Sequence, residues 1–342
     1  MKPAFPRKPQ RFFYLISLLL PAVFCVLPAQ AHSRSHHRAV VQSVQAVPPG
    51  GNALAYMLLQ HGHADAAIAE LQKVLAANPQ DALAHDLLCR AHYSERRWPE
   101  AIEECQRAVE LQPDNSEFHT WLGRSEGEAA EHASWFVALS LAHKVHTEFA
   151  AAVELTPKNV AALSDLGEYA VEAPGFLGGG LDKAEAIAHQ LQPLDAEAYH
   201  AQMARIAHKR KDPQSQEREL KLAIAQSAHP AHAWMQLASF YAWRGNYPAM
   251  EQAIRSGLAA DPQQDSALVD GASILIRNKF DSQLAKKLLQ MYIHSAHTTE
   301  ESPVFVAEAM LGNLLRQQGD MAGAEKEFAA AHALASAYKD GH

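Results

Sequence analysis

Histidine is the residue type with the most evident chemical potential, since the 342-residue chain carries 20 of them. A zinc site needs three or four converging ligands. The closest histidine pairs are His36-His37, His61-x-His63 and His143-x-x-His146. Only the last pair would share a helix face, and no cysteine or carboxylate completes a recognisable ligand set around it. We expect surface and interhelix histidines without a metal site, and keep a histidine-assisted metal-binding protein as an alternative.

Adjacent carboxylates are the second candidate for chemistry, because paired acids can perform general acid–base catalysis. They occur at Glu103-Glu104 and Glu300-Glu301. Neighbouring residues on a helix point apart, so these pairs are expected on a solvated surface. The chain also lacks Gly-x-Ser-x-Gly, His-Glu-x-x-His and Cys-x-x-Cys motifs. We predict no catalytic residues and no cofactor.

The N-terminus has the layout of a secretory signal peptide. Four basic residues lie within positions 2–11, an apolar run occupies 12–27, and Ala29-Gln30-Ala31 offers a cleavage site. The run is short for a membrane span. We expect cleavage after Ala31, a periplasmic or secreted protein without a membrane span, and a disordered tether over 32–50.

Removal of residues 1–31 takes away four basic and no acidic residues, so the net charge changes from −8 to −12. Such an acidic chain is a poor binder of nucleic acid, which requires a basic surface. Two cysteines remain, Cys89 and Cys105. They could pair in an oxidising compartment. Two buried apolar thiols are the default interpretation, and the sequence does not decide between the two.

A 34-residue period organises the rest of the chain. It separates Ala67 from Ala101 and Pro79 from Pro113. A fixed period of helix–turn–helix units is typical of an α-solenoid, in which stacking buries the apolar face of each hairpin. The expected units are 48–81, 82–115, 116–159, 160–196, 197–230, 231–264, a degenerate 265–301, and 305–338.

One repeat shows the pattern most completely, HAWMQLASFYAWRGNYPAMEQAIRSGLAADP at 232–262. It resembles the tetratricopeptide repeat, with Met250 standing where that family usually has alanine. The matching signature residues are Trp234, Leu237, Ala238, Tyr241, Ile254 and Pro262. The resemblance implies an all-α fold over 51–338: a right-handed α-solenoid of about seven to eight repeats.

The same resemblance implies an inner groove lined by the first helix of each repeat. Arg90, Arg124 and Arg205 fall at one equivalent position of that helix. Arginines there could bind a partner's carboxylate, or could pair with acids of the groove such as Glu128 and Glu168. The candidate partner-binding residues in the groove are Arg90, Tyr93, Arg124, Glu128, Glu168 and Arg205.

Two repeats exceed the period. Pro113 and Pro157 are 44 residues apart, with the surplus at about 125–145, and the fourth repeat carries an insertion at 172–181. Turns joining paired helices lie along one rim, so we expect the insertions to be neighbours. Insertions in solenoids often mark the binding face. Trp135 and Phe136 are expected to pack near Phe176 and Leu177 as a cap, with Trp135 and Phe176 as partner-binding residues.

Function follows from the fold expectation. EAPGFLGGGLDKA, in the fourth repeat, resembles a segment of exported bacterial repeat proteins of unassigned role. We expect a non-catalytic scaffold or assembly factor in the cell envelope that binds a protein or peptide through its groove and rim. An enzyme with a site under the rim is a further alternative, and dimerisation through the last helix is left open.

Overall fold

The computed structural model describes residues 50–260, 263 and 265–339. The predicted signal peptide and nearly all of the predicted tether therefore lie outside the described residues. Within them, sixteen α-helices and one short 3-10 helix account for the secondary structure, apart from one isolated bridge between Thr299 and Ser302. The prediction of an all-α repeat solenoid is confirmed.

The α-helices form eight antiparallel hairpins at the predicted places. In chain order they are α2 (Gly51–Gln60) with α3 (Ala64–Ala77), α4 (Ala82–Ser94) with α5 (Trp98–Leu111), α6 (Ser116–His132) with α7 (Trp135–Leu155), α8 (Val160–Glu172) with α9 (Leu181–Leu191), α10 (Ala196–Lys209) with α11 (Pro213–Gln226), α12 (Ala231–Trp243) with α13 (Tyr247–Ala259), α14 (Ala267–Arg277) with α15 (Ser282–Ile293), and α16 (Val304–Gln317) with α17 (Met321–Leu334). The 3-10 helix η1 (Gly175–Leu177) lies between α8 and α9. None of these described helices is both long and apolar enough to cross a bilayer.

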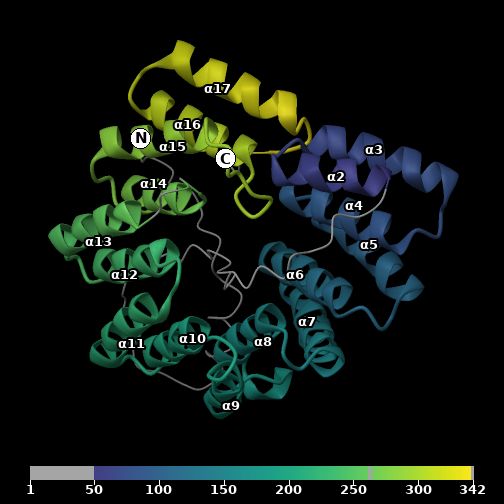
Figure 1. Ribbon diagram of the computed structural model, residues 1–342, viewed down its shortest axis with the longest axis horizontal. Coiled ribbons are helices and arrows are strands. Elements are labelled where there is room, and N and C mark those ends of the chain that lie inside the picture. The colour runs from purple at the N-terminus through teal and green to yellow at the C-terminus, as the bar shows by residue number, and fades with distance from the viewer. Residues whose placement is uncertain (1–49, 261–262, 264, 340–342) are drawn as a thin grey trace.

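The hairpins are arranged in a closed ring. First helices of most successive hairpins contact each other on the inner side, while second helices such as α5, α11 and α13 lie outside (Figure 1). The first hairpin, α2 and α3, lies beside the last, α16 and α17 (Figure 1). The sequence predicted the stack but not its closure.

We call the junction between the first two hairpins and the last one the seam. Its apolar part is a cluster of Ala64, Phe305, Ala309, Ala331 and Ala335, packed against Tyr338. Its polar part holds the backbone after α17. The amide of Ser336 donates to Asp65 at 2.9 Å, and that of Ala337 donates to Glu95 at 3.3 Å. These bonds join residues 271 and 242 positions apart, so closure depends on contacts far from each other in sequence.

A small residue lies opposite a larger one where the helices of a hairpin cross most closely. A Cβ added to Gly123 would lie 2.6 Å from the ring of Phe149, and one added to Gly312 would lie 2.7 Å from Phe328. Only glycine therefore fits these aromatic rings. The same ridge-to-groove geometry recurs along the stack.

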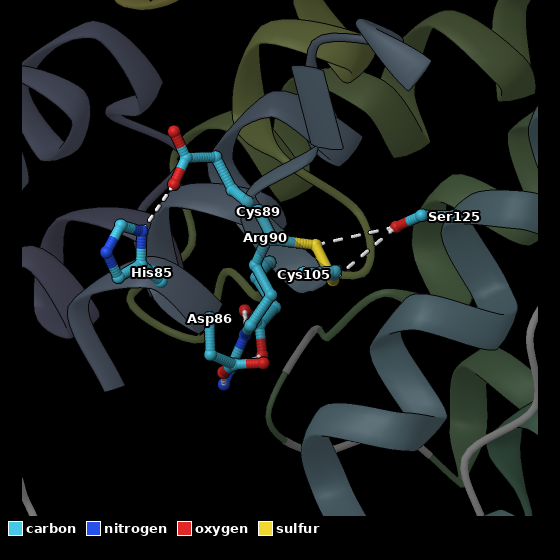
Figure 2. The surroundings of a disulfide bond; sticks show 8 residues. His85, Asp86, Cys89, Arg90, Cys105 and Ser125 are labelled. Atoms are coloured by element: carbon cyan, nitrogen blue, oxygen red, sulfur yellow. Dashed lines mark hydrogen bonds and ion pairs between the residues drawn. A yellow bond between two sulfur atoms is a disulfide. The ribbon is translucent and has the colours of Figure 1, made fainter. Parts of the chain in front are cut away.

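The second hairpin places two cysteines at this crossing. Cys89 lies one repeat before Gly123, and it forms a disulfide with Cys105. Both cysteines are fully buried, and the Ser125 hydroxyl lies within hydrogen-bonding distance of both sulfurs (Figure 2). The default interpretation of two free buried thiols is thus wrong. The disulfide links α4 to α5 covalently.

The surplus residues of the third repeat form no loop. They lengthen α6 and α7 to 17 and 21 residues, joined by a two-residue turn at Ala133 and Ser134. The segment is rich in alanine and leucine, which favour helix continuation over a loop. The fourth insertion does form a loop, which contains η1.

Candidate functional site

The inner surface near the seam holds a group of charged side chains centred on Arg90. Arg90, on α4, donates from Nε to Glu300 Oε2 at 3.0 Å and from Nη2 to the other oxygen of the same carboxylate. It also lies 3.4 Å from Asp86 and 3.5 Å from Glu117. A guanidinium that meets both oxygens of one carboxylate forms a strong, directional pair. The Nε and Nη2 groups of Arg90 are therefore both engaged by Glu300.

Aromatic rings frame this arginine. The Arg90 guanidinium lies 5.6 Å from the centre of the Tyr56 ring and 5.0 Å from that of Trp121, which also has Arg124 at 4.9 Å. We call Tyr56, Arg90, Trp121 and Arg124 the inner stack. Its members come from α2, α4 and α6, the first helices of three hairpins. At these distances each guanidinium gains a favourable cation–π contact with its ring.

The electrostatics of the cluster favour an ionised arginine and a partly protonated acid. Burial opposes the charge of Arg90, but the carboxylates of Glu300, Asp86 and Glu117 outweigh it and raise its pKa. Burial is also the main influence on Asp86, and it raises the pKa of that carboxyl to about 7. Glu300 is the principal partner of Arg90, because it accepts two hydrogen bonds from the guanidinium whereas Asp86 lies 3.4 Å away.

The other two groove arginines pair with acids of neighbouring hairpins. Arg124 Nε donates to Asp165 at 2.7 Å, and Arg205 forms an ion pair with Glu168 at 3.1 Å. Of the two uses foreseen for these arginines, pairing with groove acids is the one observed, although Arg124 takes Asp165 where Glu128 was expected. These pairs hold α6, α8 and α10 together.

His232 extends this pattern to the sixth and seventh hairpins. Its Nδ1 lies 3.0 Å from Asp270, and its Nε2 lies 3.1 Å from the Ser266 hydroxyl. Burial opposes protonation of this histidine, but the hydrogen bond and charge of Asp270, with Asp265, raise its pKa to about 9. A protonated His232 therefore serves the same inter-repeat role as the arginines.

Several residues of this site were missed or misplaced by sequence reasoning. Glu300 was expected on a solvated helical surface, but it lies in the connector between α15 and α16 with its side chain only 8% exposed. Trp121 was not selected, although its position three residues before Arg124 places both on one helix face. Tyr93 contacts Trp98 and Trp121 edge to face, which makes it a packing residue.

The two insertions are neighbours, as predicted. The Tyr169 hydroxyl lies 2.8 Å from the carbonyl oxygen of Ala142 and 2.7 Å from that of Leu177, so it links α7 to the fourth-repeat loop. Leu177 is buried in this junction. Trp135, Phe136 and Phe176 are exposed, at 39%, 80% and 69%. Leu177 is thus buried, whereas the three aromatic side chains expected in the cap are exposed to solvent.

The titratable side chains at this junction, His146 and Tyr169, pack against the fourth-repeat loop. His146 packs against Gly178 and lies 5.6 Å, ring to ring, from Tyr169. Burial lowers the pKa of His146 and raises that of Tyr169, which keeps both neutral. The amides of Gly178, Gly179 and Gly180 donate to carbonyls of the same chain. These groups stabilise the loop and leave no set of donors aimed at a substrate.

Many histidines bridge the helices of a hairpin, as expected. His85 meets Glu104 at 2.6 Å, His119 meets Glu148 at 2.6 Å, and His200 meets Glu219 at 2.8 Å. His119 also faces the carbonyl of Pro113, and the bond to Glu148 is the main reason why its pKa is raised. In the described part of the chain, no three His, Cys, Asp or Glu side chains converge as metal ligands. His36 and His37 lie outside it.

Comparison with known proteins agrees with this architecture. A family model for the tetratricopeptide repeat matches residues 58–124. Yeast Tom70 is similar over 88% of this chain and 64% of its own, with 14% identity and a TM-score of 0.53. A tetratricopeptide repeat protein of the thermophile Thermus thermophilus is similar over 56% of this chain and 96% of its own, with 19% identity and a TM-score of 0.47. A search of curated proteins finds no match. At 14% identity the likeness to Tom70 shows a shared fold alone.

Proposed function

We propose that this chain, which matches a tetratricopeptide-repeat model over residues 58–124, is a non-catalytic scaffold of the cell envelope that binds a protein or peptide partner. Repeat arrays of this kind generally serve protein interaction, and function resides in particular surfaces of the fold. Closure into a ring adds rigidity to the array. A rigid receptor loses little conformational entropy when it binds.

The observation that carries the proposal is the aromatic rim, formed by Trp135, Phe136, Val137 and Phe176. All four side chains are at least 39% exposed, and they lie on two hairpins that Tyr169 holds together. Exposed aromatic residues on a fixed framework are the usual anchors of protein interfaces. An apolar partner surface that covers the rim would remove these side chains from water.

An envelope location is supported by two independent features. A secretory signal peptide, as predicted for residues 1–31, would direct export. The buried Cys89–Cys105 disulfide is typical of proteins that fold in an oxidising compartment. Fractionation and the intact mass of the mature chain test this location. The expected mature chain is found in the envelope and begins at His32, whereas an uncleaved cytoplasmic chain would contradict it.

Affinity capture from envelope extract tests the rim. The double variant Phe136→Ser/Phe176→Ser is compared with Met321→Ser, a matched control because Met321 is 55% exposed on the outer helix α17. We expect the rim variant to lose a partner that the wild type and the control both retain. Retention of the same partners by all three proteins would show that the rim does not bind them.

A further inference from the structure

The connector between α15 and α16 forms polar contacts with the first two hairpins, which are far from it in sequence. It runs from His294 to Pro303 and reaches toward the centre of the ring (Figure 1). Its turn is organised by the Tyr292 hydroxyl, which donates to the carbonyl of Ser302 and accepts from the amide of Thr299 at 3.1 Å. Thr298 then lies 3.1 Å from His61 of the first hairpin. The turn thus places its acidic tip against the first hairpins.

Polar contacts hold this connector. Its sequence is HSAHTTEESP, and only Thr298 and Pro303 are buried residues. Its strongest anchor is the Glu300 carboxylate on Arg90, where the two side chains are 8% and 4% exposed. The charge of Glu301 also acts on Arg124 and on His232, on the third and sixth hairpins. If the connector moved away from the first hairpins, it would therefore expose little apolar surface of its own.

We propose that the face formed by Tyr56, Arg90 and Trp121 is a carboxylate-binding site for an extended acidic segment of a partner protein, and that residues 298–302 are its tethered competitor. This inference deepens the proposed function, on which it rests, by naming a partner class and its control. The Arg90 guanidinium lies 5.6 Å and 5.0 Å from the two ring centres and meets both oxygens of the Glu300 carboxylate. Glu300 shows which ligand group this arrangement fits.

Tethering determines how strongly the connector competes. A segment on a short flexible linker acts at an effective concentration of the order of 1 mM. A free acidic peptide making the same contacts must exceed that concentration to occupy the site. Loss of the Glu300 charge weakens the competitor, while Arg90 keeps the longer contacts to Asp86 and Glu117. Binding in trans should then become measurable.

The test uses a labelled peptide, HSAHTTEESP, added to the full-length mature protein. We expect the Glu300→Gln variant to bind this peptide at least tenfold more tightly than the wild type does. Glu110→Gln is the matched control, since Glu110 is an exposed acid paired with Arg107, and it should behave as the wild type. A peptide with glutamine in place of both glutamates should not bind.

Arg90 variants complete the test. In the Glu300→Gln background, Arg90→Gln should abolish peptide binding, and Arg90→Lys should weaken it because lysine keeps the charge but loses the two-pronged geometry. Circular dichroism confirms that each variant is folded. Equal binding by the wild type and Glu300→Gln, or binding that does not depend on Arg90, overturns the proposal. Capture of a partner through the rim would then still support the scaffold function.

Discussion

Closure of the ring can be tested with one methyl group. Gly62 lies in the turn between α2 and α3 with φ +72°, and an added Cβ would lie 2.7 Å from the amide nitrogen of Val304 across the seam. Gly245 occupies the same turn in the sixth hairpin with φ +70°, and it has no atom within 4 Å of an added Cβ. The two glycines share a backbone conformation but differ in contact with the seam.

The expected loss of folding stability differs between alanine at Gly62 and alanine at Gly245. Alanine in the left-handed region costs about 1–2 kcal/mol, and this applies at both positions. Arg96 and Lys211 hold positive φ at corresponding turns, which indicates that the backbone cost is tolerated. At Gly62 the contact must also widen by 0.7 Å, from 2.7 Å to an ordinary 3.4 Å, and the opposing atom is backbone. Overpacking of this kind costs about 1–3 kcal/mol.

Urea denaturation and small-angle X-ray scattering measure the outcome. Gly62→Ala should lower the free energy of unfolding by about 1–3 kcal/mol more than Gly245→Ala does. It should also increase the radius of gyration, because the seam is the part that gives way. Equal losses of stability with an unchanged radius would refute the closed ring.

Three further results are expected. Gly123→Ala should cost about 1–3 kcal/mol because its methyl group would meet an aromatic ring, whereas Gly127→Ala on the same helix should be neutral or stabilising, as thermal denaturation will show. Replacing Cys89 and Cys105 by alanine should lower the free energy of unfolding by about 2–4 kcal/mol, measured by urea denaturation against the oxidised wild type. Because the pKa of His232 is raised to about 9, its stabilisation is complete below pH 6.5 and is lost as pH rises through 9. With a quarter of that side chain exposed, we expect the stability difference between wild type and His232→Gln to shrink by about 1–2 kcal/mol from pH 6.5 to 10.

Local features of the sequence predicted the hairpins well. Each hairpin buries its own apolar positions, and closing residues such as Pro79 and Pro113 mark its end. The pairing of Cys89 with Cys105 was left open, with free thiols as the default, because cysteine is a common buried residue. The structure places Cys89, 34 residues before Gly123, at a helix crossing where the two sulfurs meet.

Closure and the inner site depend on information that the repeat pattern does not hold. Whether a solenoid stays open or forms a ring depends on small rotations between repeats, which accumulate around the stack. Arg90 and Glu300 are 210 residues apart, and neither belongs to a motif that includes the other. The acid pair Glu300-Glu301 was placed on a helix because the degenerate seventh repeat has helical periodicity. The second helix of that repeat, α15, ends at Ile293, earlier than the helical periodicity of the sequence suggests.

The three equivalent arginines differ in what they connect, and this difference has a functional consequence. Arg124 and Arg205 pair with acids of α8, on an adjoining hairpin, so their ion pairs stabilise the stack whether or not the ring is closed. The Nε and Nη2 donors of Arg90 instead bind Glu300, which lies in the connector that leads into the last hairpin. A partner carboxylate that displaces Glu300 would therefore remove one of the contacts that close the ring. Binding at this site and opening of the seam would then share one equilibrium, because a ligand that prefers the open state shifts the population toward it.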